Sequence, residues 1–309
     1  MNKKEIIEFL NAKPGYKKKG SKVLRAHLKK QGFDTLLKDC KAALSESRVR
    51  IENTVDFVKS KILIYDIETS YAIAKTWRIG YKINLNYDNL LSVPKIICIS
   101  YKWYGEDEVF NLRWDVNQDD AILLKYFVDE VLNKADCIVG HNGDRFDLPY
   151  IRTRAIANNI QMLPKYKSID TLKIARSKYR FPTNKLNDLG QYLGLGEKIK
   201  TDYSLWDRII LHKEAEALEE MIEYCNQDVN LLEKVFNVLS FSELPQEHVG
   251  VKNDLNKHTS PYNGKKDFTL VQTSVNRAGT KKHVFYDNID KKYFEMSHTA
   301  YKKHKEINE

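Results

Sequence analysis

The stretch at residues 61–70, KILIYDIETS, constrains the fold of this chain more than any other. Its apolar, β-branched run at 62–65 predicts a buried strand. Because side chains alternate along a strand, Asp66 and Glu68 should point to the same face. Two such carboxylates disfavour each other's ionisation unless a cation lies between them, and all-oxygen ligands suit Mg²⁺ or Mn²⁺. A surface Asp-x-Glu at a strand end is the alternative that this stretch alone leaves open.

Two later segments carry further candidate ligands. Residues 141–147, HNGDRFD, follow the apolar run 137–140 and place Asp147 directly after an aromatic residue. Tyr224 and Asp228 lie four residues apart in a long helical pattern, so they share one helix face. An acidic residue on the buried or cleft-facing side of a helix needs a reason, and metal ligation supplies one.

The ordered set Asp-x-Glu, Asn-x-x-x-Phe-Asp and Tyr-x-x-x-Asp resembles the DEDD (DnaQ-like) 3′–5′ exonucleases that carry a tyrosine in the third motif. The middle motif is most similar to the proofreading domains of family-B DNA polymerases. The resemblance covers about residues 58–240 and implies an α/β, ribonuclease H-like fold, with a mixed five-stranded sheet flanked by helices. It also implies two Mg²⁺ or Mn²⁺ ions and four acidic ligands: Asp66, Glu68, Asp147 and Asp228.

The resemblance implies a role for each motif residue. The Asp-x-Glu pair and Asp228 would hold one ion, and the first Asp would also hold the second, with Asp147 assisting through water. Tyr224 would align the attacking water, since a phenol with a pKa of about 10 is a poor base at neutral pH. Asn142 and Phe146 would position the terminal nucleotide.

Composition and charge agree with a nucleic-acid partner. Hydrophobic residues make up 42% and charged residues 30% of the 309, as in soluble globular proteins. The net charge of +9 is uneven, with +7 in residues 1–57, +3 in 241–309 and about −1 between them. Basic ends around a near-neutral centre favour contact with a polyanion. A lysine-rich surface that serves solubility alone is the alternative.

Compartment and redox state follow from what the sequence contains. No apolar run approaches the length of a membrane span, and residues 1–5, MNKKE, do not open a signal peptide. We therefore expect a cytoplasmic protein without a membrane partner. Four scattered cysteines without a Cys-x-x-Cys pair predict buried free thiols: Cys40, Cys98, Cys137 and Cys225.

Residues 1–57 predict a small helical module. Helical patterns at 3–12, 22–31 and 33–44 surround a basic turn, and the arrangement resembles a helix-turn-helix module. A structural cap on the larger domain is an equally weighted alternative. The basic turn supplies three candidate phosphate contacts: Lys17, Lys18 and Lys19.

The long segment at 71–94 interleaves aromatic residues with cations, which suits a single nucleic-acid strand. Trp77 is its candidate base-stacking residue, and an aromatic loop that packs on the domain is the alternative. The remaining strands are predicted at 96–104, 108–114, 137–139 and 168–170, with the first two antiparallel to the strand at 62–65. Asp170 matches none of the motif positions and is interpreted as structural. The main helices are predicted at 121–132, from 148 onward, at 186–193 and at 214–239.

Residues 256–296 resemble a zinc ribbon that has lost its cysteines. The four ligand positions are Ser260, Asn263, Asp287 and Asp290. A structural zinc site needs thiolate or imidazole, so we expect no zinc but a ribbon-like β domain that packs on the larger domain or is partly disordered. His258 and His283 have the wrong spacing for replacement ligands and are predicted to lie at the surface. Residues 297–309 form a basic tail.

These features predict a 3′–5′ exonuclease that acts on single-stranded nucleic acid with a free 3′ end, most simply DNA in replication or repair. The layout also resembles stand-alone exonucleases of bacteriophages, in which case the host cytoplasm is the location. Three alternatives stay open: an RNA exonuclease, a catalytically inactive nucleic-acid clamp, and a proofreading subunit that works beside a separate DNA polymerase.

Overall fold

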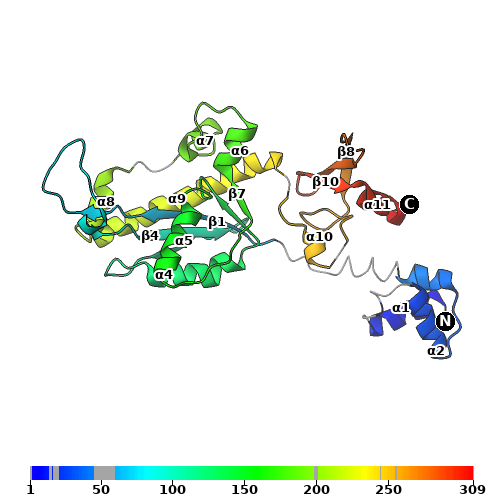
Figure 1. The fold of residues 1–309 in the computed structure, drawn as a ribbon. Helices are drawn as coiled ribbons and strands as arrows, with labels where there is room; N and C mark the ends of the chain where they lie inside the picture. The colour runs from blue at the N-terminus through cyan, green and yellow to red at the C-terminus, as the bar shows by residue number, and fades with distance from the viewer. Residues whose placement is uncertain are drawn as a thin grey trace. The chain divides into compact units, whose positions relative to one another are not determined.

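The computed structural model describes residues 2–13, 16, 21–44, 60–197, 201–243, 245–254 and 256–308. The chain forms two compact units (Figure 1). The smaller comprises Met1–Val58 with Asn253–Leu255, and the larger comprises Lys59–Lys252 with Asn256–Glu309.

The smaller unit is helical, as the sequence predicts. Helix α1 (Lys3–Ala12) begins with a capping box in which Asn2 and Glu5 each accept a backbone hydrogen bond from the other. Helix α2 (Ser21–Lys30) and a third helical stretch at 37–44 complete it. The third stretch starts later than predicted, because the backbone at Phe33 instead bonds back to the Leu28 carbonyl. Lys17, Lys18, Lys19 and the predicted connector at 45–56 lie outside the described residues.

The larger unit is built on a mixed five-stranded sheet in the order β5-β4-β1-β6-β7. The strands are β1 (Ile62–Thr69), β4 (Ile96–Trp103), β5 (Phe110–Arg113), β6 (Cys137–Gly140) and β7 (Ser168–Asp170). Strand β4 pairs antiparallel with both β1 and β5, whereas β6 runs parallel to β1 and β7. The predicted α/β sheet and its antiparallel trio are therefore confirmed.

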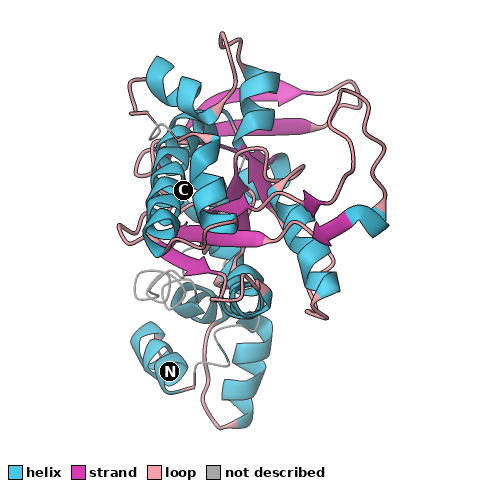
Figure 2. Cartoon of the chain, turned by 90° about the vertical axis from the view of Figure 1, so that its left-hand side faces the viewer, coloured by secondary structure: helices cyan, strands magenta, loops and turns pink. Residues whose placement is uncertain are grey.

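Helices cover both faces of this sheet (Figures 1 and 2). The helices are α4 (Ala121–Tyr126), continued by π-helical η3 (Phe127–Val131) and 3-10 η4 (Leu132–Lys134), then α5 (Asp147–Ala157), α6 (Thr171–Lys178), α7 (Leu186–Tyr192), α8 (Tyr203–Ile210) and α9 (Ala215–Leu239), with 3-10 η5 (Ser240–Ser242). Alternate residues of β1 reach two different cores. Tyr65 packs with Phe127 and Ile151 from η3 and α5, whereas Ile64 packs with Val229 of α9.

The C-terminal part contains the expected small β structure. Strands β8 (Phe268–Val275), β9 (Lys281–Asp287) and β10 (Tyr293–Ser297) form an antiparallel sheet in the order β10-β9-β8. The short helix α10 (Val249–Lys252) precedes this sheet, and the predicted basic tail forms helix α11 (His298–Asn308). The buried core of this C-terminal part consists of Phe285, Phe294 and Met296.

Hydrogen bonds join three of the four residues expected at the ligand positions of a zinc ribbon: Asn263, Asp287 and Asp290. The Asn263 side-chain amide donates to both oxygens of Asp287, at 3.0 and 3.2 Å, and to Asp290 at 2.7 Å. Asp287 also accepts the backbone N–H groups of Ile289 and Asp290. One amide therefore bridges the loop at Asn263 and the loop at 287–290 through hydrogen bonds to carboxylates.

A half-buried lysine, Lys292, packs the C-terminal sheet on the larger domain, the part built on the five-stranded sheet. The Lys292 ammonium lies 5.4 Å from the Tyr104 ring centroid, 6.0 Å from that of Phe236 and 5.9 Å from that of Tyr262. Tyr104 and Phe236 belong to the larger domain, so the cation is surrounded by aromatic rings from both sides. Packing on the larger domain is one of the two outcomes that the sequence left open for this part of the chain.

The prediction of surface histidines is wrong. His258 and His283 are only 2% and 4% exposed. His283 bonds through its two ring nitrogens to Thr273 and His298, both at 2.9 Å, beneath helix α11. The spacing of a histidine relative to zinc-ligand positions carries no information on whether its ring packs into a small core.

Two smaller expectations can be compared directly. All four cysteines are buried free thiols, as predicted. Within the described residues, no helix has the length and apolar character needed to cross a membrane.

Acidification should loosen the C-terminal sheet through His258. Burial, followed by Lys266 and Lys303, lowers the pKa of His258 to about 4. The unfolded chain, with a pKa near 6.5, then binds more protons between pH 6.5 and 4, so stability falls as the pH falls through this window. Between pH 7 and 5 we expect a loss of about 2 kcal/mol in the opening free energy, measured by hydrogen exchange of residues 268–297.

His258→Gln should remove this component of the pH dependence, whereas His212→Gln, a change at an exposed histidine, should retain it. An unaltered pH response in His258→Gln would contradict the assignment.

Candidate active site

Strand β1 presents the first two carboxylates. Asp66 and Glu68 are half-buried and alternate with buried Tyr65 and Ile67, so they share the sheet face that receives α9. In the antiparallel register Asp66 lies opposite Ser100, and Glu68 lies opposite Cys98. Pairing with β4 fixes both positions, whereas the pairing of β1 with β6 on its other edge ends at Ile64.

Helix α9 presents the third carboxylate. Its apolar stripe, with residues at alternating spacings of four and three, is buried at Ile222, Cys225, Val229, Leu232 and Phe236, and the first of the series, Leu218, is partly buried. Asp228 lies beside this stripe and is 1% exposed. A carboxylate so deeply buried is placed by the packing of the whole helix rather than by local flexibility.

The three carboxylates converge. One oxygen from each of Asp66, Glu68 and Asp228 lies within 4.8 Å of the other two. We call these three side chains together the carboxylate group. Three like charges at such spacing repel strongly in a partly buried site unless a cation or proton intervenes. The donor set contains only carboxylate oxygens, which are the ligands of Mg²⁺ and Mn²⁺, so these residues fit the predicted metal.

The floor of the carboxylate group is apolar. The Cys225 thiol donates weakly to the Asp66 backbone oxygen at 3.6 Å and approaches its side-chain oxygen at 3.8 Å. Burial, then contact with Cys98, raises the pKa of Cys225 well above its usual value, so this thiol stays protonated. A buried, uncharged thiol beside Asp66 gives a less polar surrounding than water, which strengthens charge interactions there.

Asp147 is placed differently from the other predicted ligands. It is the first residue of α5, is 4% exposed and does not belong to the group of three. Burial, followed by the negative charge of Asp147 and then by those of Asp144 and Asp66, raises the pKa of Tyr65. The negative charges of Asp147 and Asp66 therefore both act on the buried Tyr65 hydroxyl.

The remaining motif residues lie on defined elements. Tyr224 is half-buried one helical turn before Asp228 on α9. Asn142 has a positive φ of 68°, a conformation that asparagine tolerates, and its N–H donates to Asp170 at 3.0 Å. Phe146 is 44% exposed and its ring contacts Tyr150.

Asp170 is structural, as interpreted. It is buried, caps α6 through the backbone N–H groups of Leu172 and Lys173, and accepts from the loop at Asn142 and Asp144. His141 supports the same loop through Thr171, at 2.9 Å. Together they hold the second motif in place.

The loop that carries Trp77 is exposed. It rises from a short hairpin of β2 (Ile73–Ala74) and β3 (Leu90–Ser92), with a 3-10 turn η2 (Tyr87–Asn89). Trp77 is 103% exposed, so the alternative of an aromatic loop packed on the domain does not hold at this residue. The start of this loop is held by Tyr71, whose hydroxyl donates to Asp207 at 2.7 Å. Burial together with this hydrogen bond raises the pKa of Tyr71 to about 12.

The sequence at 198–208 is basic, with aromatic residues at Tyr203 and Trp206, and residues 198–200 lie outside the described chain. Tyr203 is exposed, whereas the Trp206 indole donates to the Thr69 carbonyl at 3.1 Å. Helix α8 is therefore bonded directly to the end of β1 beside the carboxylates.

A polar seam between β4 and α9 was not predicted. We define it as Ser100 and Lys102 on β4 with Asn226, Asn230 and Glu233 on α9. Ser100 donates to Asn226 at 2.7 Å, and the Lys102 ammonium lies 2.6 Å from Glu233 and 3.4 Å from Asn230. The signal was present in the sequence as a lysine within an apolar strand and polar residues spaced by four and three along the helix.

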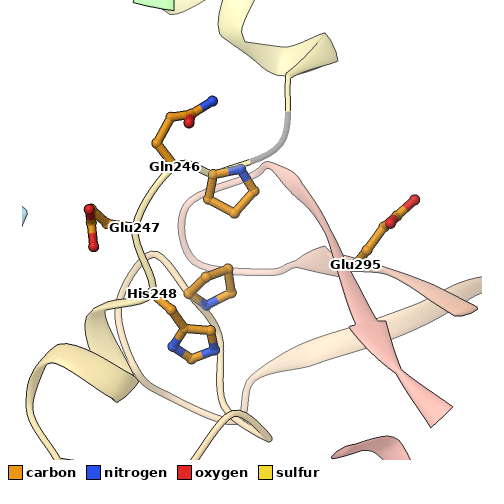
Figure 3. A pocket seen from close by; sticks show the side chains of 6 residues that line it. Gln246, Glu247, His248 and Glu295 are labelled. Carbon is orange, nitrogen blue, oxygen red and sulfur yellow. The ribbon is translucent and has the colours of Figure 1, made fainter. Parts of the chain in front are cut away.

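A cavity of about 310 Å³ lies elsewhere, in the C-terminal part (Figure 3). Its lining residues are Pro245, Gln246, Glu247, His248, Pro261 and Glu295. None of them belongs to the carboxylate group, so the cavity has no part in the chemistry of that site.

Comparisons with known proteins address the fold. A family model described as the RNase_H superfamily matches residues 92–240, which include Asp147 and Asp228 but not strand β1. The structure is similar to that of the family B DNA polymerase from the hyperthermophilic archaeon Pyrobaculum calidifontis, with a TM-score of 0.46 and 15% sequence identity. That similarity covers 71% of this chain and 31% of the polymerase chain, so it spans about a third of the polymerase. No curated protein matches the sequence. The family match and the sheet topology together show an RNase H-like domain, as predicted.

Removing one charge from the carboxylate group should have opposite effects with and without metal. In EDTA, Asp228→Asn should stabilise the protein by about 1 kcal/mol, because it relieves repulsion among three clustered carboxylates. Mn²⁺ should raise the thermal midpoint of the wild-type protein but leave this variant almost unchanged.

Differential scanning calorimetry in EDTA and in Mn²⁺ measures both effects. Asp129→Asn, a change at a carboxylate paired with Lys125 on the surface, is the matched control and should respond to Mn²⁺ like the wild type. Equal metal stabilisation of Asp228→Asn and the wild type would contradict the proposed ligand set.

Proposed function

We propose that this protein is a divalent-metal-dependent 3′–5′ exonuclease that removes nucleotides from the 3′ end of a single nucleic-acid strand, with DNA as the expected substrate. The observation that carries the proposal is the convergence of Asp66, Glu68 and Asp228 within an RNase H-like domain. A structural role alone does not account for three adjacent carboxylates that lie partly or fully out of water.

The ligand roles follow from placement. Asp66, Glu68 and Asp228 would hold Mg²⁺ or Mn²⁺, and Asp147 would assist indirectly from the start of α5. When bound, the metal would lower the pKa of an attacking water and stabilise the charge on the leaving 3′ oxygen. The carboxylates are fixed by the central strand and by a 25-residue helix, so little reorganisation is needed when substrate enters.

Side chains around the carboxylates would orient the substrate. Tyr224 would align the attacking water, since it lies one turn from Asp228 on the same helix. Asn142 and Phe146 would position the terminal nucleotide from the loop that Asp170 holds. Trp77, which is fully exposed on a basic loop, would stack on a base further along the strand.

Activity on a separate polymerase's product would fit the same chemistry. The similar polymerase is about three times as long as the region that it shares with this chain. Action beside a partner polymerase is therefore a separate proposal from the nuclease activity. The exonuclease assay below does not depend on it.

End-labelled strands test the proposal directly. With Mg²⁺, a 5′-labelled single strand should be shortened stepwise, while a 3′-labelled strand should release its label as a mononucleotide. Asp66→Asn should reduce the rate by at least about 10³-fold, because it removes a ligand shared by the predicted ions. EDTA should abolish turnover, and circular dichroism should show that the variant remains folded.

Asp129→Asn again serves as control and should retain full activity. Parallel DNA and RNA strands identify the preferred sugar. Retarded but intact strands with Mg²⁺ would contradict the exonuclease and favour a nucleic-acid clamp, and unchanged turnover by Asp66→Asn would exclude the proposed site.

A further inference from the structure

A buried cation lies on the same sheet face as the carboxylate group. Lys102 is 4% exposed and pairs with Ile64 across the sheet, two positions from the pair formed by Asp66 and Ser100. Two residues along a strand span about 7 Å, and a lysine side chain is of nearly that length. The Lys102 ammonium is therefore within side-chain reach of the carboxylates.

Two residues of α9 hold this ammonium at the far end of the polar seam. Glu233 lies 2.6 Å from the Lys102 nitrogen, and the Asn230 side-chain oxygen accepts at 3.4 Å. Glu233 is itself fixed, because its other oxygen accepts the Gly105 N–H at 2.9 Å. Both residues follow Asp228 on the same helix, so the helix that presents the third carboxylate also restrains the cation.

Holding Lys102 in place matters because three negatively charged carboxylates lie nearby. Three clustered carboxylates attract any nearby cation, and attraction is strong where water is excluded. A lysine freed from Glu233 is flexible and can turn towards Asp66 or Asp228, whereas a paired lysine is already neutralised. Lys102 and a divalent ion are thus alternative neutralising partners for the same carboxylates.

We propose that Glu233 and Asn230 are positioning residues that hold Lys102 away from the carboxylate group, so that a divalent cation neutralises it. The inference deepens the proposed function and rests on it for the identity of the ion. It assigns a role to the polar seam that neither the motifs nor the fold family supplies.

Manganese binding, measured by titration calorimetry on the full chain, tests the inference without an activity assay. Glu233→Gln should weaken Mn²⁺ binding about tenfold, because the freed Lys102 competes for the carboxylates. Asn230→Ala should weaken it less. The double variant Lys102→Met with Glu233→Gln should return to within about twofold of the wild type, since the competitor is gone.

Glu219→Gln is the matched control, because Glu219 lies on the same helix and pairs with Arg113 at the surface. It should bind Mn²⁺ like the wild type. Circular dichroism establishes that each variant is folded, and Asn230→Ala provides the test if Glu233→Gln does not fold.

Two results would overturn the inference. One is wild-type affinity in folded Glu233→Gln or, if that variant does not fold, in folded Asn230→Ala. The other is a double variant that binds as weakly as Glu233→Gln, since the loss would then come from disturbed packing. Absence of Mn²⁺ binding by the wild-type protein is a different outcome, which would overturn the proposed function itself and this inference with it.

Discussion

The packing of helix α9 across strands β1 and β4 is the interaction on which the site depends. Asp66 and Glu68 come from the central strand, and Asp228 comes from the helix about 160 residues later. Repulsion among the three would separate them if the elements were free to move. Burial of the apolar stripe around Val229 stabilises the contact between α9 and the sheet. This stabilisation offsets the repulsion among the carboxylates and holds them together.

Apolar packing alone does not fix where a helix lies along a sheet, because many hydrophobic arrangements have similar free energies. The polar seam fixes the position of helix α9 along the sheet, because Ser100 donates to Asn226 and Lys102 forms an ion pair with Glu233. Sliding the helix by one turn would leave these buried groups unpaired, which costs more than a lost apolar contact. Stability and the geometry of the three carboxylates are thus set by two different sets of residues on one helix.

The sequence was informative where a single pattern dominates. The alternation around Asp66, the apolar spacing of α9 and the antiparallel trio all follow from local periodicity, and each was predicted. Contacts between distant segments were not accessible. The pairing of Lys102 with Glu233 joins positions 131 residues apart, and the burial of His258 and His283 depends on a helix that the sequence presented as a basic tail. The small C-terminal sheet was expected from a resemblance to a zinc ribbon, but the hydrogen bonds from Asn263 to Asp287 and Asp290 required coordinates.

The central claim is that three carboxylates form one divalent-cation site. Anomalous X-ray diffraction from crystals soaked in Mn²⁺ tests it most directly, because the signal locates the metal itself. We expect a strong anomalous peak coordinated by oxygens of Asp66, Glu68 and Asp228. Crystals that contain Mn²⁺ at other positions but show no peak among these three side chains would contradict the claim.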